Sequence, residues 1–189
     1  MRKIVAGLFI SLDGVYEAPD QWHFPYFNDE MGAAVGGQMQ NSDTMLLGRV
    51  TYEEFAGYWP DHADDPEIGA FMNDTPKLVV SNTLTSLDWK NSTLVTGDVT
   101  GQLTAIKAQP GKNIGVTGSG TLVRSLIEDG VLDELHLLVH PIAVGKGKNL
   151  WSDLKGTVPL ELVSSEKFST GVLYNIYRPA PAQAESTES

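Results

Sequence analysis

The sequence lacks cysteine entirely among its 189 residues. This absence excludes disulfide bonds, thiolate metal sites and a cysteine nucleophile, and it fits a reducing compartment. Long apolar runs are missing too, since none approaches the roughly 20 residues that a membrane-spanning helix requires. From Met1 the chain enters a strand-like segment without the apolar stretch and cleavage site of a signal peptide. We therefore expect a cytoplasmic protein with no membrane partner.

Basic residues are scarce, with 13 Lys and Arg against 24 Asp and Glu, and the formal net charge is −11. Proteins that bind nucleic acids usually need a basic face, so we expect no nucleic-acid partner. Any phosphate that this chain binds must be held by local groups. The length and the 41% hydrophobic content predict a single domain over residues 1–179. Residues 180–189, rich in Pro, Ala, Glu and Ser, are expected to form a disordered tail.

The order of the apolar segments predicts an α/β protein. Runs rich in leucine and β-branched residues indicate strands at residues 4–10, 44–47, 77–81 and 134–140. Helical patterns between the strands include those over residues 28–39 and 99–108, whereas residues 160–165 and 172–178 are typical of an antiparallel hairpin. Strands that alternate with helices favour a mostly parallel sheet with helices on both faces, here completed by the C-terminal hairpin.

Residues 113–130 combine a short apolar strand, the turn Gly118-Ser119-Gly120 and an amphipathic helix whose apolar stripe includes Leu122 and Leu126. A strand that enters a helix through glycines leaves the first N–H groups of that helix free at the sheet edge. There they and the helix dipole can bind a phosphate. The alternative is that the glycines only permit a tight turn. Both interpretations fit this segment taken alone.

Two further strand ends carry polar turns. Gly48-Arg49 precedes a helix that we expect to begin at Thr51, because Thr51 and Glu54 have the spacing of a capping box. Ser81-Asn82 follows the strand at residues 77–81. Ligands of open α/β sheets bind beyond the carboxyl ends of the strands, so all three turns are expected to converge. Two helix N-termini and an arginine suit a ligand with several phosphates, such as a dinucleotide, and this favours the phosphate interpretation.

Three other groups of residues have a structural interpretation that we prefer to a functional one. The acidic loop at residues 61–65 contains His62, but a solvated loop is favoured over a metal site. His136 and His140 are four residues apart on one predicted strand, a separation of roughly 13 Å that is too large for one ion. We expect no metal. The aromatic loop at residues 21–26 can wall a flat ligand, although packing over the core edge is favoured.

Five motifs, in this order, resemble one known family. They are Ser11-Leu-Asp-Gly14, Leu47-Gly-Arg-Val-Thr-Tyr-Glu53, Lys77-Leu-Val-Val-Ser-Asn-Thr83, Gly118-Ser-Gly-Thr-Leu122, and the segment from Gly130 to Pro141 with Gly145-Lys-Gly147. Together they are similar to the dihydrofolate-reductase-like fold, and within it to the reductase domain of riboflavin biosynthesis and its small bacterial relatives. The resemblance covers Met1 to about Pro179 and implies a three-layer α/β fold with a mostly parallel central sheet.

The resemblance also implies an NADPH site. The cofactor phosphates would meet Gly48, Arg49 and Thr51, and the adenosine with its extra phosphate would meet Ser81 and Asn82. The pyrophosphate would meet Gly118, Ser119, Gly120 and Thr121, and the nicotinamide would meet Ala6 and the loop of Asp13 and Gly14. The family's catalytic carboxylate falls near Glu30 or Asp29, so the predicted catalytic residues are Glu30, Asp29 and Asp13.

These observations lead to an expected function with alternatives. We expect an NADPH-dependent reductase that passes hydride to a small heterocyclic substrate of pteridine or pyrimidine type, with a proton from Glu30, Asp29 or water. A second hypothesis is a non-catalytic nucleotide-binding protein that keeps the reductase fold. A third, flavin or quinone chemistry, would use the aromatic loop at residues 21–26. The resemblance further implies a homodimer.

Overall fold

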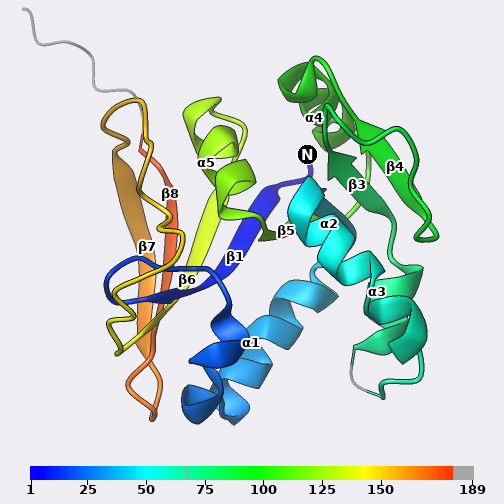
Figure 1. Ribbon diagram of the computed structural model, residues 1–189. Helices are drawn as coiled ribbons and strands as arrows, with labels where there is room; N and C mark the ends of the chain where they lie inside the picture. The colour runs from blue at the N-terminus through cyan, green and yellow to red at the C-terminus, as the bar shows by residue number, and fades with distance from the viewer. Residues whose placement is uncertain (67, 181–189) are drawn as a thin grey trace, which may run out of the picture.

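The computed structural model describes residues 1–66 and 68–180 as a sheet of eight strands with helices packed on it (Figure 1). The strands are β1 (Ile4–Ser11), β2 (Ser42–Gly48), β3 (Lys77–Val80), β4 (Ser92–Val95), β5 (Asn113–Gly118), β6 (Glu134–His140), β7 (Leu160–Lys167) and β8 (Leu173–Pro179). Their order in the sheet is β4-β3-β2-β5-β1-β6-β8-β7. The strands from β4 to β6 pair in parallel, whereas β8 is antiparallel to β6 and to β7. The predicted mostly parallel sheet with a C-terminal hairpin is confirmed.

Five α-helices connect the parallel strands, together with short 3-10 helices at Pro19–Gln21, Phe24–Tyr26 and Trp59–His62. They are α1 (Asp29–Gln40), α2 (Arg49–Ala56), α3 (Gly69–Asp74), α4 (Val99–Lys107) and α5 (Gly120–Glu128). The helices predicted over residues 28–39 and 99–108 are therefore confirmed. No helix within the described residues is both long enough and apolar enough to span a membrane.

Side-chain alternation along the central strands divides the helices between the two faces of the sheet. Ile4 and Leu8 of β1 pack into a core that includes Leu103 of α4 and the apolar stripe of α5. Phe9, on the opposite face of β1, packs with Met31 of α1. Residues of β2 and β3 on that second face pack against α2 and α3. The sheet is therefore the middle of three layers, because its central strands are buried on both faces.

The start of α2 differs from the prediction. The helix begins at Arg49 with Gly48 as its N-cap, so Thr51 lies inside the helix and is buried, and the predicted capping box of Thr51 and Glu54 is wrong. The reason is a tertiary contact, since a Cβ atom at Gly118 would lie 2.8 Å from the Thr51 hydroxyl oxygen. The hydroxyl of Thr51 therefore packs against the β5–α5 turn. The side chain of Glu54 is left without a role in capping.

Helices α1, α4 and α5 begin at side chains that satisfy a free N–H group of their first turn. Asn28 Oδ1 accepts from the Met31 N–H (3.0 Å) at the start of α1, and Ser119 Oγ accepts from the Leu122 N–H (3.4 Å) at the start of α5. At the far end of the chain, the tail predicted at residues 180–189 lies outside the described residues except for Ala180. Its N–H donates to the carbonyl oxygen of Pro159 (3.0 Å).

Candidate functional site

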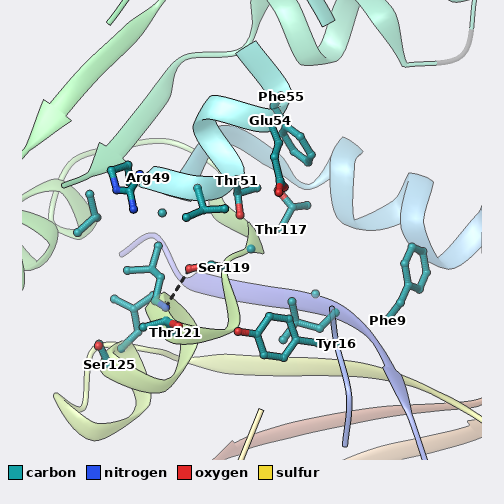
Figure 2. Close-up of a pocket in the computed structure, with 18 of the residues that line it drawn as sticks. Phe9, Tyr16, Arg49, Thr51, Glu54, Phe55, Thr117, Ser119, Thr121 and Ser125 are labelled. Atoms are coloured by element: carbon teal, nitrogen blue, oxygen red, sulfur yellow. Dashed lines mark hydrogen bonds between the residues drawn. The ribbon is translucent and has the colours of Figure 1, made fainter. Parts of the chain in front are cut away.

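A cavity of about 1040 Å³ lies between α2 and the β5–α5 turn and extends over β1 toward α1 (Figure 2). The polar side chains in its wall are Tyr16, Glu17, Gln38, Arg49, Thr51, Glu54, Asp98, Thr100, Thr117, Ser119, Thr121, Ser125, Asp129 and Lys148. Its aromatic side chains are Phe9, Tyr16, Phe55 and Trp59. A space of this size exceeds the need of one small ligand, so it suits an extended ligand or two ligands side by side.

The Gly48 and Gly118 turns are in direct contact. β2 pairs with β5 so that Leu47 lies opposite Gly118. A Cβ atom at Gly48 would lie 2.7 Å from the hydroxyl oxygen of Ser119, closer than real Cβ atoms approach. Glycine at 48 therefore allows the two strand ends to meet. The predicted convergence of these two turns is confirmed, and it brings the N-termini of α2 and α5 together at the cavity.

The meeting point of these helices has the chemistry of an anion site. The wall there contains the hydroxyl groups of Ser119 and Thr121 from α5 and the guanidinium of Arg49 from α2 (Figure 2). Arg49 Nη1 donates to Glu53 Oε2 (2.8 Å), and both side chains are about half exposed. Because such an exposed pair contributes little to stability, Arg49 can exchange this partner for a phosphate at small cost.

The third predicted turn is near the cavity but does not line it. Ser81 Oγ accepts from the N–H groups of Thr83 (3.1 Å) and Leu84 (3.0 Å). Asn82 Oδ1 accepts from the Thr96 hydroxyl (3.0 Å) and supports the following loop. Val80 and residues 97–100, which comprise the end of that loop and the start of α4, line this part of the cavity instead. Asp98, the N-cap of α4, was the sequence signal that could have identified this loop.

Three other predicted cofactor positions are also outside the wall. Ala6 is buried in the core, and the next strand residues, Gly7 to Phe9, line the cavity. Gly14 has φ +85° and lies against the side chain of Asn149. Gly120 is buried under Tyr16, because a Cβ atom there would lie 2.4 Å from the Tyr16 ring. Gly120 therefore contributes by allowing Tyr16 to reach the cavity, a role that the sequence did not reveal.

The carboxylates predicted to be catalytic do not line the cavity. Glu30 Oε2 accepts from the Ser169 hydroxyl (2.6 Å) and from the Ser169 N–H (2.7 Å), and these two bonds hold the pKa of Glu30 below its usual value. Glu30 thus links α1 to the β7–β8 turn. Asp29 is exposed in the first turn of α1. Asp13 accepts from the N–H groups of Val144 (3.0 Å) and Gly145 (2.7 Å) and so fixes the loop that follows β6.

We expect replacement of Asp13 by asparagine to lower the melting temperature at neutral pH by roughly 2–4 °C. Hydrogen bonds from the Ser11 hydroxyl and from two backbone N–H groups lower the pKa of Asp13 to about 2. A lowered pKa means that the carboxylate stabilises the fold above its unfolded pKa, and that this contribution is lost as the pH falls toward 2. Thermal melts of both proteins across this pH range check the prediction.

The matched control for this prediction is Asp88→Asn. Asp88 is exposed and has no hydrogen bond within the described part of the chain. The Asp88→Asn substitution should leave the melting temperature unchanged at every pH. If Asp13→Asn still melted at an equally lower temperature than the wild type near pH 2, the explanation by an ionised carboxylate would be contradicted.

The remaining charges near the cavity are largely paired. Lys148 and Glu17 form an ion pair (3.1 Å) that raises the pKa of Lys148 and lowers that of Glu17. Both are therefore charged at neutral pH, and together they add no net charge to the wall. In residues 1–66 and 68–180, no group of three His, Asp or Glu side chains could hold a metal ion.

The aromatic loop packs over the core edge, as favoured from the sequence. Trp22 and His23 are buried, with the His23 ring stacked on Phe9 at 4.6 Å and the Trp22 ring edge-on to His140 at 5.1 Å. Residues 21–26 are not in the cavity wall, which takes its aromatic surface from Phe9 and three residues outside this loop. The loop thus supports the wall through Phe9.

The sequence and the fold assign this chain to a family. The model of the RibD C-terminal domain matches residues 2–174. The chain belongs to this family. Among curated proteins, it is 28% identical over 180 residues to the uncharacterised protein YyaP of Bacillus subtilis (strain 168), an alignment that covers 93% of this chain and 94% of YyaP.

Solved structures identify the fold of this RibD C-terminal domain. A protein of Shewanella sp. PV-4, whose name refers to riboflavin biosynthesis, matches with a TM-score of 0.78 and 19% identity over 95% of this chain and 99% of the other. Dihydrofolate reductase from Enterococcus faecalis, solved with NADP(H), matches with a TM-score of 0.64 and 14% identity over 95% and 97% of the two chains. The predicted dihydrofolate-reductase-like fold is confirmed.

Proposed function

We propose that this protein is an NADPH-dependent reductase that transfers hydride to a small heterocyclic substrate. The observation that carries the proposal is the contact between the Gly48 and Gly118 turns, which joins two helix N-termini and Arg49 in one cavity. Helix N-termini and arginine bind phosphate groups, and a dinucleotide has several. The membership of the family and the fold shared with an NADP(H)-bound reductase support the same proposal.

Under this proposal, residues of the cavity wall would contact the phosphates, the adenosine and the nicotinamide of NADPH. The hydroxyl groups of Ser119 and Thr121 and the guanidinium of Arg49 would hold the phosphates, and the loop at residues 97–100 would flank the adenosine. The backbone of β1 from Gly7 to Phe9 would form the floor under the nicotinamide. The bound nicotinamide supplies the hydride in such a reductase.

The protein's contribution would be to position both ligands and to exclude water. Tyr16 lies over the start of α5, and Phe9 and Phe55 line the end of the cavity next to α1 (Figure 2). Apolar walls around a polar floor hold a flat ring close to the nicotinamide in a fixed orientation. This half of the cavity is therefore the proposed substrate half, next to the phosphate half around Arg49.

A non-catalytic nucleotide-binding protein is the second candidate, since Glu30, Asp29 and Asp13 all lie outside the cavity wall. The two candidates are separated by incubating the full chain with NADPH and a panel of pteridines and pyrimidines while the absorbance of NADPH is followed. We expect at least one compound to oxidise NADPH in proportion to the protein concentration. Tight NADPH binding without oxidation across the panel would favour the non-catalytic protein.

A further inference from the structure

Glu54 is a carboxylate of the cavity wall that forms no hydrogen bond and no ion pair within the described residues. It lies on α2, five residues after Arg49, and Figure 2 shows its side chain directed from α2 toward the side of the cavity that Thr117 occupies. Thr117, near the end of β5, exposes its side chain in the same wall. No residue in the described part of the chain makes a hydrogen bond or an ion pair with Glu54.

The other three carboxylates of the wall are already engaged. Glu17 pairs with Lys148, and Asp98 Oδ1 accepts from the Gly101 N–H (2.9 Å) as the cap of α4. Asp129 accepts from the Thr100 hydroxyl (3.4 Å). Since a carboxylate facing a cavity gains most from a ligand when nothing else satisfies it, Glu54 is the acidic group available to a substrate.

The surroundings of Glu54 contain one lysine, Lys148, against two carboxylates, Glu54 and Glu17. Arg49 and Lys148 are the cationic residues of the wall in the described structure; Arg49 lies at the phosphate turns, and Lys148 interacts electrostatically with Glu54 but forms its ion pair with Glu17 (3.1 Å). Phe9, Phe55 and Trp59 contribute apolar ring surface to the same wall. Together, Glu54, Glu17 and Lys148 leave a net charge of −1, so an anionic substrate would meet an excess of negative charge here. A flat ring with N–H donors or a positive charge would satisfy Glu54 and pack against the aromatic rings.

We propose that Glu54, with Thr117 beside it, determines substrate specificity in the substrate half of the cavity and selects an unphosphorylated, nitrogen-rich heteroaromatic ring that presents N–H donors. The assignment of this half to the substrate rests on the proposed reductase function. The selection itself depends on the charge of Glu54 and is measurable without turnover. It separates this chain's substrate from phosphorylated pyrimidines, which would need a cation in this half that is not already paired with Glu17.

The test is binding of two probes to the full chain, 2,4-diaminopyrimidine and uridine 5′-monophosphate, by calorimetry with saturating NADPH and without it. We expect the wild-type protein to bind 2,4-diaminopyrimidine more tightly than the nucleotide. Glu54→Gln should weaken the binding of 2,4-diaminopyrimidine about tenfold or more, because the substitution removes a charge-assisted hydrogen bond. The matched control Glu166→Gln, an exposed position on β7, should bind as the wild type does.

Several results would overturn the proposal. They are tighter binding of uridine 5′-monophosphate, unchanged 2,4-diaminopyrimidine affinity in Glu54→Gln, or no detectable binding of 2,4-diaminopyrimidine to the wild type at millimolar concentration. If Glu30→Gln weakened 2,4-diaminopyrimidine binding and Glu54→Gln did not, the substrate-binding carboxylate would be Glu30 of α1. NADPH titration of Glu54→Gln separates this proposal from the reductase function, since we expect the variant to keep wild-type NADPH affinity and melting temperature. Failure of the wild type to bind NADPH would instead count against the reductase.

Discussion

Replacing Arg49 with alanine is expected to weaken NADPH binding about 10- to 100-fold while affecting NADH much less, which corresponds to the loss of one charge-assisted bond to phosphate. Arg49 is the cation of the wall at the phosphate turns, whereas Asp98 and Asp129 are acidic groups of the same wall. Without the arginine, the extra phosphate of NADPH would face these carboxylates alone. Fluorescence titration of both cofactors into wild type and variant measures the two ratios.

The control for Arg49 is its neighbour on the same helix. Glu53 accepts a hydrogen bond from Arg49 at 2.8 Å, so Glu53→Gln releases the guanidinium without changing the cavity wall. This variant should bind NADPH as tightly as the wild type or more tightly. If Arg49→Ala weakened the binding of NADPH and of NADH equally, the guanidinium would not contact the extra phosphate.

Replacing Gly48 with alanine is expected to lower the free energy of unfolding by about 1–3 kcal/mol and to weaken the binding of NADPH at least tenfold. The backbone of Gly48 (φ −76°, ψ 160°) suits any residue, so the cost comes from contact alone. The new methyl group would lie 2.7 Å from Ser119 Oγ and would separate the two turns. Denaturant unfolding and NADPH titration measure the two effects.

A double variant tests the same contact by moving the bulk from one turn to the other. Ser119→Gly removes the hydroxyl oxygen and the Cβ atom that the new methyl group would meet, leaving the backbone nitrogen at 3.4 Å. Gly48→Ala with Ser119→Gly should therefore recover most of the lost stability, less a few tenths of a kcal/mol for the missing cap of α5. If the double variant were no more stable than Gly48→Ala, the contact between the turns would not explain the loss.

The parallel sheet could be predicted from sequence because its central strands are buried on both faces. Continuous apolar runs such as residues 4–10 occur where helices cover both sides, and β1 does lie between β5 and β6. The amphipathic stripe with Leu122 and Leu126 likewise placed α5 correctly. These signals are local and repetitive. The contact of the Gly48 and Gly118 turns followed from the topological rule that parallel strands end at the same edge.

The substrate half could not be predicted because it depends on where α2 begins. The sequence indicated a start at Thr51 with Glu54 returning to the helix N-terminus, but the helix begins at Arg49. In a capping box the Glu54 carboxylate would point back to the Thr51 N–H, whereas in the observed helix Glu54 lies in the second turn and lines the cavity. What decides the start is the packing of Thr51 against Gly118, a contact between distant segments.

The carboxylates near Asn28 show the same limitation. Glu30 has the residue type and approximate position of a catalytic acid, yet it bonds to Ser169 in the β7–β8 turn. Its partner lies near the other end of the chain, and no local pattern around residue 30 reveals it. Asp13 is comparable, since its partners Val144 and Gly145 belong to the loop after β6, which neighbours β1 in the sheet but is distant in the sequence.

The most direct test of the cofactor site is a calorimetric titration of NADPH into the full-length protein at moderate salt. We predict one binding event per chain with a dissociation constant in the micromolar range, and a large loss of affinity in Gly48→Ala. The absence of binding heat and of any rise in melting temperature at millimolar NADPH would contradict the assignment of this cavity to a nicotinamide dinucleotide.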